Sequence, residues 1–161
     1  MPNHCHNRVT IYGSGNNTEE TREQIAKLKG IFEDEKIFTH FIPEPDWPNM
    51  PLLTSDKHYG TKYGNDGELP VKEENPWLRY VFQSTGITDQ RWYDWRLQNW
   101  DTKWDAYEVS IDDDDPDQLE VEFDTAWSPP EAICHAMREQ YPDLSVSWFY
   151  DEPGCELAGY L

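Results

Sequence analysis

The chain has 161 residues, which is enough for one domain with a sizeable insertion. Its 13 basic and 32 acidic residues give a net charge of −19, which excludes nucleic acids, anionic membranes and acidic metabolites as partners of the general surface. Aromatic residues make up 14% of the chain, with 8 Trp, so a packed core is expected and wholesale disorder is not.

The lack of targeting signals and the few cysteines favour a cytoplasmic protein. No apolar run approaches the roughly 20 residues of a membrane span, and the opening Met-Pro-Asn-His lacks the basic and apolar regions of a signal peptide. Cys5, Cys134 and Cys155 form an odd and sparse set, which argues against a disulfide framework. We therefore expect a protein of a reducing cytoplasm.

The N-terminal part predicts a strand, a helix and a second strand. Residues 5–12 have the composition of a strand and run into a glycine- and asparagine-rich turn. Thr18 is the expected N-cap of an amphipathic helix, because acidic residues follow it in the first turns, and Gly30 is its expected end. Residues 36–42 predict the second strand.

A long segment rich in Pro, Gly and aromatic residues follows, and we interpret it as an insertion at about 43–92. Within it, residues 43–76 show no periodic pattern, which is typical of a functional or mobile loop. Residues 75–85 could form a short helix with Pro76 at its first position. A tryptophan-rich stretch extends over residues 77–104.

The clearest pattern is an antiparallel hairpin. Apolar residues stand at every second position from Tyr107 to Ile111, and again from Leu119 to Phe123, with polar residues between them. Period two on both sides of the turn-rich residues 112–118 predicts two strands with one buried and one exposed face.

The C-terminal part predicts a helix and two further strands. The helix opens at Ser128-Pro-Pro-Glu131 and runs through Met137, and Tyr141-Pro-Asp143 ends it. Residues 144–150 predict a strand, and a turn leads to a last short strand at 155–161. The whole order predicts an α+β fold: a single domain over residues 1–161 with a ferredoxin-like antiparallel sheet, two helices and the long insertion.

Four segments resemble a known family. They are the opening Met1-Pro-Asn-His4 with Asn7, the stretch Trp95–Trp104, the run Phe123-Asp-Thr-Ala-Trp-Ser-Pro-Pro130, and Tyr150–Gly154 followed by Ala158-Gly159. They resemble the YubB ferredoxin-like domain family, which phages, prophages and plasmids carry. The resemblance implies a ferredoxin-like fold with an insertion, a mobile-element origin and a location in the cytoplasm of the bacterial host. It implies no catalytic residues.

The negative charge is concentrated in one half of the chain. Residues 1–80 have a net charge of −4 and residues 81–161 one of −15, and residues 105–124 hold ten acids and no base. The run Asp112–Asp115 is not part of the family pattern. The carboxylates assigned to a partner-binding surface are Glu108, Asp112, Asp113, Asp114, Asp115, Asp117, Glu120, Glu122 and Asp124.

This acidic hairpin has three interpretations. Glu120, Glu122 and Asp124 repeat at roughly 6.6 Å along a strand, which is similar to the spacing of successive phosphates, about twice 3.4 Å. A carboxylate ladder of this kind can imitate a nucleic acid and bind a basic groove. The same residues can form an ordinary solvated sheet face that protects an edge strand. Calcium is a third, weaker reading, because the run lacks the spacing and the central Gly of an EF-hand loop.

The tryptophan-rich segment offers an alternative function. Most of its aromatic residues are expected in the core. A narrow ligand or nucleotide cleft would use tryptophans for stacking and the few nearby cations for the phosphates. The residues of this alternative cleft are Arg91, Arg96, Trp100, Lys103 and Trp104.

Nothing in the sequence indicates an enzyme, a cofactor or a metal site. No nucleophile elbow, P-loop or dinucleotide fingerprint is present. His4 and His6 stand on one side of a strand, but no second ligand pair with zinc spacing supports a site. Asn3 and His4 belong to the resemblance and are expected to be structural.

We therefore expect a non-enzymatic accessory protein of a phage or mobile element. Its acidic, DNA-mimicking surface would bind a basic host protein, in particular a DNA-binding defence complex, as an anti-CRISPR or other anti-defence inhibitor does. The alternative is a small-ligand or nucleotide-binding protein. Neither hypothesis includes direct nucleic-acid binding or a membrane, and the sequence defines no oligomeric state.

Overall fold

A five-stranded antiparallel sheet forms the centre of the computed structural model, which describes residues 3–15, 18–47, 50 and 91–161. The strands are β1 (His4–Gly13), β2 (Tyr107–Asp112), β3 (Gln118–Ala126), β4 (Leu144–Glu152) and β5 (Leu157–Tyr160). The helices are α1 (Glu19–Phe32), the 3₁₀ helix η1 (Phe38–His40), α3 (Arg91–Asn99) and α4 (Glu131–Gln140). The expected α+β class with an antiparallel sheet is confirmed.

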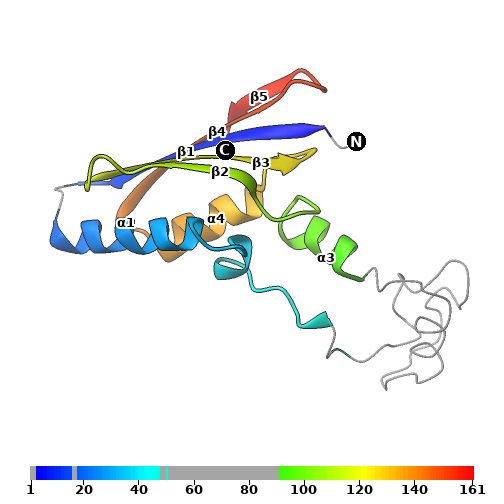
Figure 1. The fold of residues 1–161 in the computed structure, drawn as a ribbon, viewed down its shortest axis with the longest axis horizontal. Coiled ribbons are helices and arrows are strands. Elements are labelled where there is room, and N and C mark those ends of the chain that lie inside the picture. The colour runs from blue at the N-terminus through cyan, green and yellow to red at the C-terminus, as the bar shows by residue number, and fades with distance from the viewer. Residues whose placement is uncertain (1–2, 16–17, 48–49, 51–90) are drawn as a thin grey trace, which may run out of the picture. The chain divides into compact units, whose positions relative to one another are not determined.

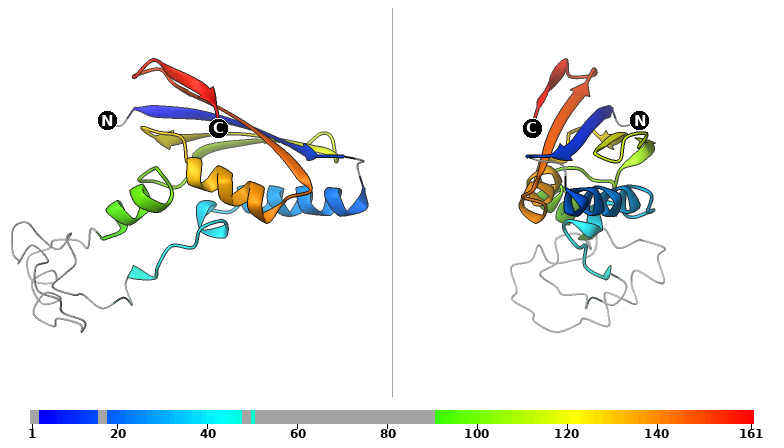
Figure 2. Two further views of the ribbon diagram at one scale, coloured as in Figure 1. Left: turned by 180° about the vertical axis from the view of Figure 1, so that it is seen from behind. Right: turned by 90° about the vertical axis from the view of Figure 1, so that its left-hand side faces the viewer.

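The strand order is β2-β3-β1-β4-β5, so β1 lies in the middle and pairs with both β3 and β4. Helices α1 and α4 lie side by side on one face of this sheet (Figures 1 and 2). Against them the sheet turns fully buried side chains such as Val9, Val121 and Trp148. In the described parts of residues 1–43 and 97–161, no helix lies over the opposite face.

The first helix begins as the sequence predicts and ends later. The Thr18 side chain accepts from the Thr21 N–H, and the Thr21 hydroxyl accepts from the Thr18 N–H, which completes a capping box. Gly30 does not end α1. The helix continues through Ile31 and Phe32, because both side chains are buried in the core.

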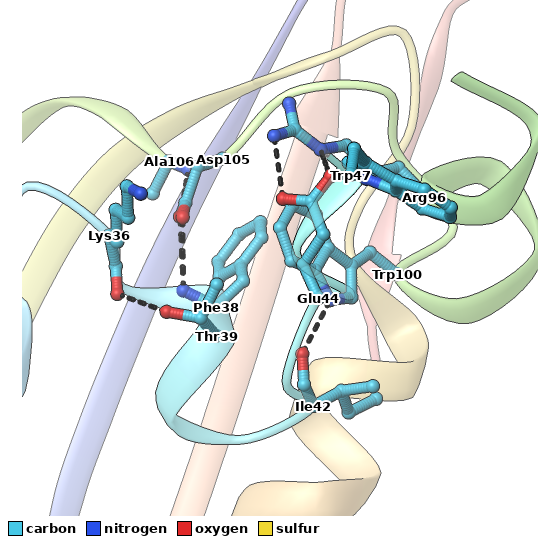
Figure 3. Close-up of polar contacts among 10 residues, drawn as sticks. All are labelled: Lys36, Phe38, Thr39, Ile42, Glu44, Trp47, Arg96, Trp100, Asp105 and Ala106. Atoms are coloured by element: carbon cyan, nitrogen blue, oxygen red, sulfur yellow. Dashed lines mark hydrogen bonds and ion pairs between the residues drawn. The ribbon is translucent and has the colours of Figure 1, made fainter. Parts of the chain in front are cut away.

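The prediction of a strand at residues 36–42 is wrong. The chain forms the 3₁₀ helix η1 there, and Ile37, Phe38 and Phe41 are all buried rather than alternating. The Phe38 N–H donates to the distant carboxylate of Asp105 (3.1 Å), as Figure 3 shows. The Phe38 ring packs edge-on against Trp100 (centroids 5.6 Å apart), so tertiary contacts determine this conformation.

The predicted hairpin is confirmed as β2 and β3, with one deviation. The register shifts between Tyr107 and Ser110, and Glu108 has a φ of 51°. This irregularity puts Tyr107 opposite Asp124, on the face that β3 exposes, so the expectation that Tyr107 lies on the buried face is wrong. The β3 strand keeps its alternation, with Leu119, Val121 and Phe123 buried.

The C-terminal elements are also confirmed, with different bounds for the strands. Helix α4 (Glu131–Gln140) ends immediately before Tyr141-Pro-Asp143, as the sequence predicts. Strand β4 extends to Glu152, where it pairs with β5. No described helix has both the length and the apolar character that crossing a membrane requires.

The chain divides into two compact units, residues 1–43 with 97–161 and residues 44–96. Most of the irregular stretch 43–76 and the whole helix predicted at 75–85 lie outside the described residues. Within the described part of the second unit, the Arg96 guanidinium forms two hydrogen bonds with the Glu44 carboxylate (2.8 and 2.7 Å; Figure 3).

The surroundings of Gly30 and Gly154 predict opposite effects of a Gly→Ala substitution on stability. A Cβ on Gly30 in α1 would meet no atom within 4 Å, whereas a Cβ on Gly154 would lie 2.3 Å from Asn3 Nδ2 and 2.9 Å from Glu152 Oε1. We expect Gly30→Ala to raise the free energy of unfolding by roughly 0.5–1 kcal/mol, since alanine favours helix. We expect Gly154→Ala to lower it, and urea unfolding of both variants measures the difference. A stabilised Gly154→Ala would contradict the described packing.

Candidate functional site

The face of the sheet opposite α1 and α4 gathers charged and aromatic side chains, and we call it the open sheet face. Cross-strand pairing brings its residues into rows: Asp124 of β3, His6 of β1 and Asp151 of β4 form one, and Glu122, Arg8 and Phe149 form the next. The charged and aromatic residues of the open sheet face include His6, Arg8, Tyr12, Tyr107, Glu108, Asp112, Glu120, Glu122, Asp124, Phe149, Asp151 and Tyr160.

The three ladder carboxylates predicted from β3 lie in one column on this face, and each has a partner. Asp124 Oδ1 lies 2.5 Å from His6 Nδ1, and Glu122 Oε1 accepts from Arg8 Nε (2.6 Å). Glu120 Oε1 accepts from Gln118 Nε2 (2.8 Å). The column is therefore flanked by the imidazole and guanidinium of β1, which the hairpin pattern alone does not reveal.

A hollow of about 350 Å³ opens between β2, β3, β1 and β4. Glu108 and Asp151 line it from opposite sides, and neither forms an ion pair with another described residue. Phe149 also lines it and stacks edge-on against Tyr160 (centroids 5.2 Å apart). Tyr160 is 74% exposed, so an aromatic pair adjoins the carboxylates.

The acidic residues of the β2–β3 turn are held differently from those of the strands. Asp113 forms an ion pair with Lys29 (2.5 Å) and Asp117 one with Arg22 (2.6 Å), both on α1. The carboxylates of Asp112 and Asp115 accept backbone N–H groups inside the turn, from Asp114 and Asp117. Asp112 at the end of β2 and Asp113, Asp115 and Asp117 of the turn thus contribute to the local structure, whereas the Asp114 carboxylate forms no hydrogen bond or ion pair with the described residues.

The nine carboxylates assigned from the sequence therefore fall into two groups. Glu108, Asp112, Glu120, Glu122 and Asp124 share the open sheet face. Asp113, Asp114, Asp115 and Asp117 lie on the turn. Sequence reasoning missed Asp151, Phe149 and Tyr160, because only the pairing of β4 with β1 and β5 brings them to the same face.

The five residues of the alternative ligand cleft are divided between the two units. Arg91 and Arg96 belong to residues 44–96, and both have partners there: Arg91 donates to the carbonyls of Trp47 and Met50, and Arg96 binds Glu44. Trp100, in the other unit, is 1% exposed and donates to the Ile42 carbonyl (3.0 Å; Figure 3). Lys103 lies 4.3 Å above the Trp104 ring.

Two of the three cysteines, Cys5 and Cys134, are buried, and Cys155 is exposed. Burial raises the pKa of Cys5 to about 11, and the thiol faces the core rather than the side of His4 and His6. His4 contacts the Tyr107 hydroxyl (2.7 Å), which agrees with its expected structural role. No group of three His, Cys, Asp or Glu among the residues described could hold a metal ion.

The residues that carry the family resemblance meet at one end of the sheet. The backbone N–H of Trp127 donates to the Asn3 carbonyl (3.0 Å). The buried Glu152 accepts the backbone N–H of Cys155 (2.5 Å), and Gly154 lies against Asn3 and Glu152 with no room for a side chain. These motifs join the start of β1 to the ends of β3 and β4, which is a structural role.

A family model agrees with a ferredoxin-like architecture for the C-terminal part of the chain. Residues 99–161 match the family model of the ferredoxin-like domain in Api92-like protein. The crystal structure of a protein api92 from Yersinia pseudotuberculosis is similar at 11% identity, over 99% of this chain and 93% of that chain, with a TM-score of 0.49. No curated protein matches the sequence.

The ion pairs of the turn predict a pH dependence. Hydrogen bonds from Arg22 and Lys29 lower the pKa of Asp117 and of Asp113, respectively, below the ordinary value. Because the pKa is lowered in the folded state, the stabilising contribution is present above the ordinary Asp pKa of about 3.9 and is lost as the pH falls through the lowered values. We expect Arg22→Gln to raise the pKa of Asp117 and leave that of Asp113 unchanged, as a carboxyl ¹³C NMR titration measures. If the two values moved together, the pairs would not be independent.

Proposed function

We propose that this chain is a non-enzymatic protein-binding module whose open sheet face docks on a basic surface of a partner protein. The observation that carries the proposal is the composition of a sheet face that no helix in the described parts of residues 1–43 and 97–161 covers. Its six carboxylates come from β2, β3 and β4, whereas Arg8 is its one residue with a permanent positive charge. A surface of this sign attracts and orients a basic partner.

The internal ion pairs do not prevent this docking. The side chains of Arg8 and Glu122 are 62% and 57% exposed, and an exposed pair of this kind contributes less than about 1 kcal/mol. A basic side chain of a partner can therefore replace Arg8 on Glu122 at little cost. Glu108 and Asp151 have no ion pair to give up within the described residues.

The aromatic residues of the same face supply apolar contact. Tyr160 is 74% and Tyr12 44% exposed, and Phe149 lies between the acidic column and Tyr160. In protein interfaces a few aromatic anchors provide most of the affinity, while surrounding charges set the association rate and the choice of partner. The combination fits a protein partner better than a small cation.

The partner we infer is a protein whose basic groove binds DNA. Glu120, Glu122 and Asp124 repeat along β3 at roughly the spacing of successive phosphates. The resemblance to the YubB ferredoxin-like domain family of phages and plasmids supports a mobile-element accessory protein acting in the host cytoplasm. On this proposal the partner is a DNA-binding defence complex, and the protein acts as an anti-CRISPR or similar anti-defence inhibitor.

A salt-resolved pull-down with added DNA tests the proposal. The immobilised protein is exposed to bacterial host lysate at low and high salt, with and without duplex DNA. We expect a DNA-binding protein that salt and duplex DNA both release, because charge attraction is screened and the two ligands compete for one groove. Captured proteins that duplex DNA does not release would contradict DNA mimicry.

Two matched triple variants distinguish the effect of the charges on the open sheet face from the effect of the protein's total charge. The triple variant Glu120→Gln, Glu122→Gln and Asp124→Asn removes three charges from the face. The control Glu20→Gln, Glu35→Gln and Glu139→Gln removes three exposed charges elsewhere. We expect the first to weaken binding about tenfold or more, equivalent to roughly 1.4 kcal/mol, and the control to change it little. Equal losses, or no loss, would overturn the assignment of the face.

A further inference from the structure

A second concavity lies away from the open sheet face, between helix α1 and the β2–β3 turn. Its volume is about 450 Å³, within the range of roughly 300–1,000 Å³ typical of ligand pockets. Ile25 and Leu119, both buried, form its floor, and the exposed Ala26 and Pro116 form part of its walls. We call it the α1–turn groove. It shares no lining residue with the hollow on the open sheet face.

Two ion pairs hold the α1–turn groove open. Arg22 and Lys29 are seven residues apart on α1, about 10.5 Å along the helix axis, and bind Asp117 and Asp113 of the turn. Between them on the same face of the helix stands Ala26, whose methyl group is too small to fill the space. The turn is thus tied to α1 at two points with an apolar gap between them.

The rim of the α1–turn groove is acidic. Glu19, Glu23 and Asp115 line it and form no ion pair with another described residue. The two cations that line it, Arg22 and Lys29, are already neutralised by the turn carboxylates. A ligand that places apolar groups on the floor and positive charges at the rim would therefore match both parts of the groove.

We propose that the α1–turn groove is a second docking site, which takes the apolar side of a short basic amphipathic helix from a partner protein. A helix offers apolar side chains at positions i and i+4, about 6 Å apart, so two anchors fit between the ion pairs. Lysine or arginine residues beside these anchors meet Glu19, Glu23 and Asp115. This site is independent of the function proposed for the open sheet face.

Synthetic peptides test the α1–turn groove directly. The probe is a fluorescently labelled helical peptide of about 18 residues built from Leu, Ala and Lys, with Leu at helical spacing along one side. A second peptide has Gln in place of every Leu and the same charge. We expect the Leu peptide to bind about tenfold more tightly or better, measured by anisotropy at physiological salt. Equal affinities would show attraction by charge alone and would overturn the proposal.

Substitutions in the protein locate the binding site. Ala26→Phe fills the groove and should weaken binding of the Leu peptide about tenfold or more, while circular dichroism and thermal unfolding confirm that the variant folds. Unchanged binding by a folded Ala26→Phe protein overturns the proposal. If Ala26→Phe does not fold, Pro116→Glu, which puts a charge on the opposite wall, takes its place with the same expected loss.

The two triple variants described above distinguish the sites. If the cationic peptide binds in the α1–turn groove, the open-face variant should weaken its binding no more than the control does, because Glu20 of the control stands on α1 next to Glu19 of the rim. A greater loss of peptide affinity with Glu120→Gln, Glu122→Gln and Asp124→Asn would show that the peptide binds the open sheet face. That result would overturn the proposed docking site in the α1–turn groove. The pull-down tests the open sheet face, and the peptide assay with Ala26→Phe tests the α1–turn groove. Either proposal can therefore fail while the other stands.

Discussion

The buried amide of Asn7 links the three central strands of the sheet. Its Nδ2 donates to Thr125 Oγ1 on β3 (3.0 Å), and its Oδ1 accepts from Trp148 Nε1 on β4 (3.0 Å). Because side chains alternate between the faces of a strand, a slip of one residue would exchange the buried and the exposed sets. Such a slip would also leave a buried polar group unpaired, which costs roughly 1–3 kcal/mol. The composition of the open sheet face therefore depends on a polar network inside the sheet.

The central position of β1 determines how the negative charge is distributed. A hairpin alone would present Glu120, Glu122 and Asp124 as a row of bare carboxylates. The pairing with β1 puts His6 and Arg8 beside two of them. The Arg8–Glu122 contact is exposed and weak, whereas Asp124 in the His6–Asp124 contact is only 19% exposed. On the proposed function, a partner's cations would therefore reach Glu122 more readily than Asp124, and salt would screen their attraction to both.

Local patterns predicted the elements whose residues make their own contacts. Thr18 caps α1 together with Thr21, three positions away. In β3, the alternation of apolar and polar residues matches the alternation of buried and exposed side chains. Predictions failed where contacts with residues distant in the sequence determine the local backbone conformation. Residues 36–42 have the composition of a strand, but the Phe38 N–H donates to the Asp105 carboxylate, and no local signal marks that contact. Likewise, the irregular pairing at Glu108 depends on the neighbouring strand, and the site residues Phe149 and Asp151 share the face only through strand order.

The segments that carry the family resemblance hold residues of the framework, and they also hold two carboxylates of the open sheet face, Asp124 and Asp151. Asn3, Asn7 and Glu152 bind backbone or buried groups at the strands they join, so a substitution there would act first on stability. None of the three contributes charge to the open sheet face. A chain can therefore keep this framework and present another surface, since function depends on the site that a fold carries. Glu120, Glu122 and the groove beside Ala26 lie outside these segments, so on the proposed function they can change with the partner while Asn3, Asn7 and Glu152 stay the same.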